Sequence, residues 1–179
     1  MTRPTSRVTG RLRVGDEAVT VDGPGGVARI YGHGNAQRWA WLHADLGGGD
    51  VLEVVSAVSR RPGMRLLRPL PFVRLRVNGR DWPHEPLLSA PLFTADPALP
   101  AWRLRGVSGR HRLTVQVRLD PAESVALDYA DPDGAGSVCT NSERASADVL
   151  LERWHGSWQT SRRWRLDRTA HAEVGLRRS

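Results

Sequence analysis

Two tryptophans, a histidine and an aspartate recur at every second position of one short stretch. Residues 38–46 read Arg-Trp-Ala-Trp-Leu-His-Ala-Asp-Leu. Because successive side chains of a strand point to opposite faces, Trp39, Trp41, His43 and Asp45 share one face. Indoles beside an imidazole and a carboxylate are typical of a ligand cavity. The alternative is a pair of core tryptophans with a hydrogen-bonded histidine at the rim of the core.

The opposite face of the same strand is small and purely apolar. A connection at residues 47–50, Gly-Gly-Gly-Asp, leads into a second apolar strand at residues 51–58, which predicts a hairpin. If Leu46 pairs with Val51, Ser56 lies opposite Trp41 and joins the ligand-binding residues, whereas Glu53 falls on the apolar face. We expect that apolar face to be an exposed interface patch, made of Ala40, Leu42, Ala44, Leu46, Val51, Val55 and Ala57.

Short alternating segments separated by turn residues continue through the rest of the chain. The clearest turn is Asn78-Gly79, a strong hairpin signal, and residues 84–100 are proline-rich and predicted to form a loop. About ten short strands without a βαβ pattern predict an all-β protein, an antiparallel sandwich or barrel. At 179 residues the chain predicts a single domain, 1–179.

Charge and composition narrow the choice of partner and compartment. The net charge is +7, yet all 26 basic residues are arginines scattered along the chain. Nucleic-acid binders concentrate such charge in a patch, so we expect no nucleic-acid partner. RNA binding through Arg74, Arg76, Arg103 and Arg105 remains a third hypothesis. With neither a signal peptide nor an apolar span in the sequence, we expect a cytoplasmic protein that does not span a membrane.

Other motifs give weaker signals. His33, His43 and Asp45 form a conceivable metal set, but nothing else supplies the spacing of a metal loop, so no metal is predicted. Cys139, the single cysteine, is expected to be a buried structural thiol. No phosphate-binding glycine loop and no nucleophile elbow are present.

The stretch from Tyr31 to Ala44 resembles a segment of a known lipocalin-like group. Tyr-Gly-His-Gly-Asn at residues 31–35, followed by Trp-Ala-Trp at residues 39–41, is similar to the Trp-rich motif of carotenoid hydratases (hydroxyneurosporene synthases), tocopherol cyclases and AttH-like proteins. Asn35 stands where that motif has tryptophan, and Gly32 replaces its acidic residue. The resemblance extends at low specificity over most of the chain.

The resemblance implies a lipocalin-like (calycin-like) β-barrel corresponding to the second barrel of a two-barrel family. If this chain is the second barrel alone, we expect it to associate with a second copy of itself or with a separate first-barrel protein. The family's enzymes protonate an olefin and direct water or a hydroxyl onto the cation, with no cofactor. This implies His33, His43 and Asp45 as catalytic residues, with Tyr31, Asn35, Trp39, Trp41 and Ser56 around the ligand.

Two functions follow from this resemblance. The first is a cofactor-independent cyclase or hydratase acting on a hydrophobic isoprenoid- or polyketide-like molecule by general acid catalysis. The second is a non-catalytic carrier of such a molecule. The face with Trp41 and His43 favours the enzyme, and the substitutions around His33 favour the carrier.

Overall fold

The computed structural model describes residues 3–27, 36–59, 61, 63, 68–130 and 136–177. The chain divides into two compact units, Met1–Gly32 and His33–Ser179. The first unit is a hairpin in which β1 (Arg3–Val14) pairs antiparallel with β2 (Glu17–Val27). Its turn uses Gly15 at a φ of 59°, a left-handed conformation that favours glycine.

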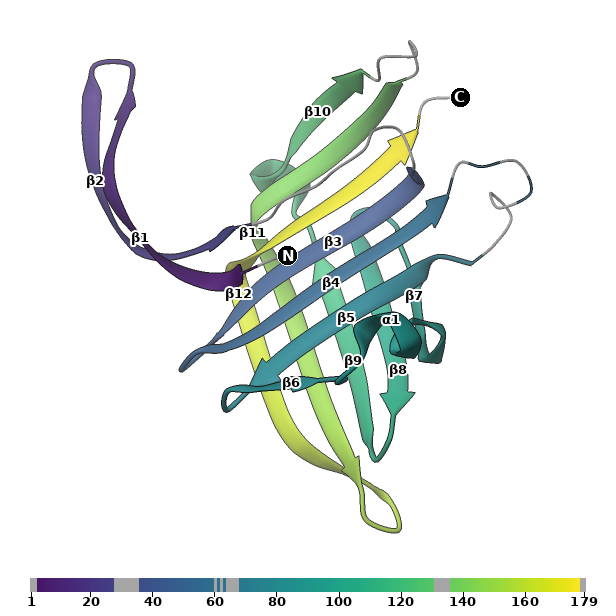
Figure 1. Cartoon of the computed structure of the whole chain (residues 1–179). Coiled ribbons are helices and arrows are strands. Elements are labelled where there is room, and N and C mark those ends of the chain that lie inside the picture. The colour runs from purple at the N-terminus through teal and green to yellow at the C-terminus, as the bar shows by residue number, and fades with distance from the viewer. Residues whose placement is uncertain are drawn as a thin grey trace. The chain divides into compact units, whose positions relative to one another are not determined.

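The second unit is one antiparallel sheet of ten strands, nearly free of helix (Figure 1). Its strands lie in the order β6-β5-β4-β3-β12-β11-β9-β8-β7, and β10 pairs with β11 beside this path. Their bounds are β3 Ala36–Gly47, β4 Asp50–Ser59, β5 Leu70–Val77, β6 Arg80–Trp82, β7 Phe93–Asp96, β8 Ala101–Ser108, β9 His111–Arg118, β10 Val125–Ala130, β11 Gly136–Trp154 and β12 Trp158–Arg177.

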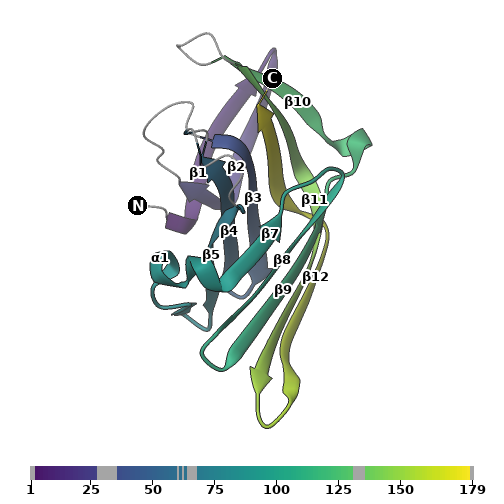
Figure 2. The same cartoon turned by 90° about the vertical axis from the view of Figure 1, so that its right-hand side faces the viewer.

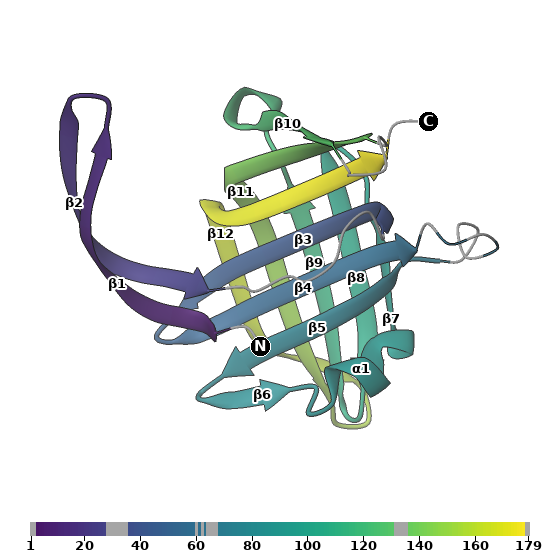
Figure 3. The same ribbon diagram turned by 45° about the horizontal axis from the view of Figure 1, so that its top comes forward.

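The sheet curls so that its two halves face each other. Figure 2 shows β7, β8 and β9 standing opposite β3, β4 and β5, and Figure 3 shows the same two layers from above. Strand β7 contacts β5, so the two ends of the sheet approach each other. The all-β, antiparallel prediction is therefore confirmed, and the curled sheet is consistent with a lipocalin-like fold.

The core fills the space between the two halves. It is built from the small face of β3, with Ala40, Leu42 and Ala44 all 0 % exposed. These residues face large side chains of the other half, among them Leu104 and Leu113, in one continuous cluster. The predicted interface patch on this face is wrong, because its residues on β3 lie in the core.

The hairpin between β3 and β4 differs from its predicted register by one residue. Only Gly48 and Gly49 form the turn, with φ values of 63° and 85° that suit a two-residue type I′ turn. Gly47 consequently pairs with Asp50, and a bulge follows before the next ladder pair. The shift moves Glu53 opposite His43 and Ser56 opposite Ala40, which reverses the faces predicted for both residues on β4.

Two segments are more regular than their sequences indicated. After residue 136 the chain forms two long strands, β11 and β12, in place of several short ones, and their pairing is irregular between Ser142 and Ala147. The predicted loop at 84–100 contains a short helix, α1 (Pro86–Ser89), a 3-10 turn and strand β7. No helix within the described residues has the length and apolarity needed to cross a membrane.

Candidate functional site

The face of the sheet opposite the core carries an ordered set of aromatic, apolar and ionisable side chains. Cross-strand pairing arranges these side chains in three rows that run from β5 through β4 and β3 to β12, and the second and third rows continue to β11 and β10. We call this surface the platform; its rows are Arg74-Glu53-His43-His171, then Phe72-Val55-Trp41-Glu173-Asn141-Val125, then Leu70-Ala57-Trp39-Gly175-Cys139-Leu127.

His43 lies in the charged row and pairs with a carboxylate of the neighbouring strand. Its Nδ1 is 3.3 Å from Oε1 of Glu53, and the two side chains are 21 % and 17 % exposed. The acidic partner expected from sequence, Asp45, is exposed and accepts a hydrogen bond from the backbone N–H of Gly47 at 2.9 Å. Asp45 therefore stabilises the turn, and Glu53 is the carboxylate next to the imidazole.

A second histidine stands directly across from the first. His171 of β12 pairs in register with His43 of β3. The Asn141 amide Nδ2 lies 3.2 Å from His171 Nε2 and donates to Glu173 Oε1 at 3.1 Å. The two histidines thus differ: His43 is held by a carboxylate, and His171 by an amide.

The glutamate at position 143 also approaches this second imidazole, at 3.2 Å from His171 Nε2. Its side chain is 70 % exposed, so this ion pair is screened by water and contributes little. Asn141 is therefore the partly buried partner of the His171 imidazole, and Glu143 is its exposed partner.

Aromatic rings join the polar and apolar parts of the platform. The Trp41 indole meets the His171 imidazole edge-on, with ring centroids 4.5 Å apart, and lies 6.4 Å from the ring of His43. The Trp39 ring lies close against Gly175, since a Cβ at that position would fall within 2.3 Å of three ring atoms. Tyr129 of β10 lies 6.4 Å from Trp39 and extends the aromatic surface.

Cys139 is buried under this aromatic edge. Burial, reinforced by the negative charge of Glu173, raises the pKa of the Cys139 thiol to about 12. Its Sγ lies 3.8 Å from Glu173 Oε2, so the thiol stays protonated at neutral pH. This agrees with the prediction of a buried structural thiol.

We expect Cys139 to resist alkylation by iodoacetamide in the folded protein at pH 8.5 and to react at an ordinary rate in urea. The thiolate is the nucleophile, and a rise of about three pH units in the pKa lowers its population by about a thousandfold. The same shift makes stability depend on pH. Between pH 9 and pH 12 the Cys139 thiol ionises in the unfolded chain but not in the folded one, so the free energy of unfolding falls as pH rises.

Mass spectrometry of time points measures this reaction. The matched control is Val125→Cys in a Cys139→Ala background, which places a thiol at an exposed position (61 %) of the adjacent strand. Equal rates for the two thiols in the folded state would contradict the assignment.

The residues predicted from sequence fall into three groups. Trp39, Trp41 and His43 lie together on the platform. Ser56 lies on the core face, 0 % exposed, and its Oγ has no hydrogen-bond partner in the described structure. Tyr31, His33 and Asn35 lie outside the described residues.

Sequence reasoning missed the half of the site that comes from distant strands. His171, Glu173 and Asn141 reach the platform only through the pairing of β12 with β3 and β11. A signal was present, since His171, Glu173 and Gly175 alternate with Ala170, Ala172 and Val174 in the printed sequence. Within the described residues, no group of three or more histidine, cysteine, aspartate or glutamate side chains is placed to hold a metal ion.

The antiparallel, curled all-β sheet with its filled core is consistent with a lipocalin-like fold. The chain belongs to the tocopherol cyclase-like family, whose pattern it matches over residues 4–176.

Two relatives are uncharacterized proteins of Mycobacterium tuberculosis, one from strain CDC 1551 / Oshkosh and one from strain H37Rv. Each is 49 % identical to this chain over 175 residues, which is 97 % of this chain and 50 % of the relative. The chain therefore spans about half the length of these curated relatives. No solved structure matches the chain.

Proposed function

We propose that this chain binds a hydrophobic isoprenoid- or polyketide-like molecule on the platform and catalyses its acid-promoted cyclisation or hydration. One observation carries the proposal: a surface with exposed apolar side chains on β4, β5 and β10 and aromatic side chains on β3 lies beside two histidines that face each other across a strand pair and are held in different ways. Membership of the tocopherol cyclase-like family supports cyclase-type chemistry.

The apolar part of the platform offers exposed surface for a long hydrocarbon. Val55 is 44 % exposed, Leu70 41 %, Val125 61 % and Leu127 41 %. These residues form two groups, one on β4 and β5 and one on β10, and exposed apolar patches mark binding surfaces. A ligand lying along these residues places a polar or olefinic end beside Trp41 and the histidines.

His43 is the proposed acid. Protonated beside Glu53, it keeps Nδ1–H directed at the carboxylate and has Nε2–H free to transfer a proton. Transfer to one carbon of an olefin breaks the N–H bond, forms a C–H bond and leaves a carbocation on the other carbon. Asp45 takes no part in this step, because its carboxylate is engaged in the turn.

His171 is the proposed base. As an internal hydroxyl or a water adds to the cation, a C–O bond forms and the oxygen loses its proton to a neutral imidazole. Proton exchange with water then restores both histidines, so the net reaction is an isomerisation or a hydration. The indole of Trp41, beside His171, stabilises the passing positive charge through its π electrons.

One observation favours the second function, a non-catalytic carrier. The side chains of His43 and His171 are 21 % and 24 % exposed, so water reaches both, whereas cation chemistry requires a site from which water is excluded. We therefore propose that catalysis needs a cover over the platform, supplied by a homodimer mate or a separate first-barrel protein.

A prenylated hydroquinone, whose tail carries an olefin and whose ring carries a hydroxyl, tests the proposal. Binding is followed by quenching of tryptophan fluorescence, and cyclisation by chromatographic separation of the isomer. We expect His43→Gln to lower turnover by about 10²- to 10⁴-fold while leaving affinity nearly unchanged. Trp41→Ala is expected to weaken both, and the control His155→Gln, in an exposed turn, to change neither.

The outcomes separate the two functions. Saturable binding that Trp41→Ala weakens, without turnover by the wild-type chain or by its assembly, would leave the carrier and reject the enzyme. Absence of saturable binding would reject both.

A further inference from the structure

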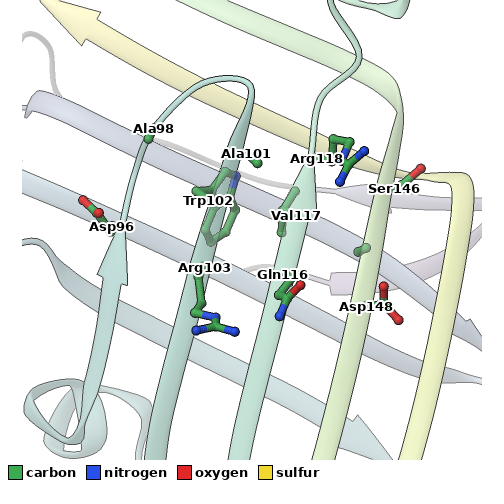
Figure 4. Close-up of a pocket in the computed structure, with 11 residues that line it drawn as sticks. Asp96, Ala98, Ala101, Trp102, Arg103, Gln116, Val117, Arg118, Ser146 and Asp148 are labelled. Atoms are coloured by element: carbon green, nitrogen blue, oxygen red, sulfur yellow. The ribbon is translucent and has the colours of Figure 1, made fainter.

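We propose a second binding site, for a phosphate-bearing anion, on the outer face of strands β8, β9 and β11. A pocket of about 530 Å³ lies there (Figure 4), a size within the range of ligand sites. The site involves no residue of the platform, so it does not depend on the function proposed above.

Strand pairing builds the floor of this pocket from exposed side chains. One row crosses the sheet as Asp96-Arg103-Gln116-Asp148-Arg165, and a second as Ala101-Arg118-Ser146. Trp102, Val117 and Ala147, which alternate with these residues and also line the pocket, belong to the core. The polar side chains therefore lie on the face away from the core.

Two guanidinium groups at this pocket have no carboxylate partner. Within the described part of the chain, Arg103 and Arg118 form no ion pair. The carboxylate of Asp148 is already engaged by Arg165 at 3.5 Å and Arg163 at 3.8 Å. The positive charges of Arg103 and Arg118 are therefore not neutralised by the carboxylate of Asp148, and a bound anion would neutralise them.

The chemistry of the lining selects phosphate. Two arginines, Arg103 and Arg118, line the pocket together with two carboxylates, Asp96 and Asp148. Because Asp148 is already paired with Arg163 and Arg165 outside the lining, the two guanidinium groups outnumber the one remaining carboxylate, which favours an anion. Guanidinium groups pair with phosphate oxygens through two parallel N–H donors. Ser146 adds a hydroxyl hydrogen, because its Oγ accepts from the Arg168 backbone N–H and keeps its own proton free to donate.

The pocket exceeds a single phosphate in size. It therefore suits a diphosphate or a phosphate with a small attached group, and this chemistry has two sources, a free phosphorylated compound and the headgroup of an anionic lipid. The experiment distinguishes the two sources.

Calorimetric titration with inorganic diphosphate is the first arm. The second is co-sedimentation with phosphatidylcholine vesicles containing phosphatidic acid, against vesicles of phosphatidylcholine alone. We expect Arg103→Gln combined with Arg118→Gln to weaken binding at least about tenfold in the arm that binds, since each charged hydrogen bond is worth that much. Thermal melting checks that the variant remains folded.

A control with the same loss of charge is Arg80→Gln combined with Arg153→Gln, both exposed and neither among the residues that line this pocket. Its binding is expected to stay within about twofold of wild type, because screened charges at a distance contribute little. Binding in the diphosphate arm identifies a free ligand, and binding in the vesicle arm alone identifies a lipid headgroup.

Three results would overturn the proposal: no saturable binding in either arm, equal weakening by the two double variants, or tighter binding to a single-stranded oligonucleotide than to both phosphate probes. The last result would indicate that the arginines of β8 and β9 serve a nucleic acid.

Discussion

Truncation of Leu42 to alanine is expected to lower the free energy of unfolding by about 2–5 kcal/mol. Leu42 is 0 % exposed and belongs to the cluster that joins the two halves of the sheet. The lost methyl groups contribute both transfer free energy and a cavity, because Leu52 and Val54 around the site belong to strands whose pairing fixes them. Urea denaturation at constant slope measures the change.

The matched control is Val55→Ala. Val55 lies on the neighbouring strand, on the platform face, and is 44 % exposed. Its truncation should cost less than about 1 kcal/mol, because most of the removed surface was already in contact with water. Similar losses for the two variants would mean that the faces of β3 and β4 have been assigned the wrong way round.

Gly175→Ala is expected to destabilise the protein by about 1–3 kcal/mol and to displace the Trp39 ring. A methyl group at Gly175 would occupy the space of the indole atoms Cε2, Cζ2 and Cη2. The same substitution in a Trp39→Ala background should be neutral or slightly stabilising, because alanine restricts the unfolded chain more than glycine does. The cost therefore depends on the ring.

A double-mutant cycle on Trp39 and Gly175 isolates this contact, with an expected coupling of about 1–3 kcal/mol. Ligand affinity measured on the same four proteins shows whether the position of the indole matters for binding. Additive effects would contradict the packing of Trp39 on the Gly175 backbone.

The alternation of β3 was evident in its sequence, but the face that forms the core was not. Large indoles on one side and alanines on the other suggested that the tryptophans lined an interior. In the structure the alanines face inward, because Leu104, Leu113 and other large residues of the opposite layer fill the space that they leave. The side chains of the opposite layer come from distant segments of the chain, and their volumes decide which face of β3 packs inward. The alternation within one strand carries no information about them.

The register of the hairpin depended on a turn of glycines. Gly47, Gly48 and Gly49 all adopt positive φ values, and any two of them satisfy the backbone demands of a tight turn. A sequence with three glycines therefore leaves the pairing open by one residue, which decides whether Glu53 meets His43 or the core.

His43 and His171 meet through the pairing of β3 with β12. All the other described strands of the second unit, β4 to β11, lie between these two in the chain. The pairing of β3 with β12 therefore closes a very long loop and raises the contact order of the fold. The local hairpins β3–β4, β8–β9 and β11–β12 have short closures and are expected to form earlier. During folding, the two imidazoles of the platform therefore come together in one of the last steps, when the sheet is otherwise assembled.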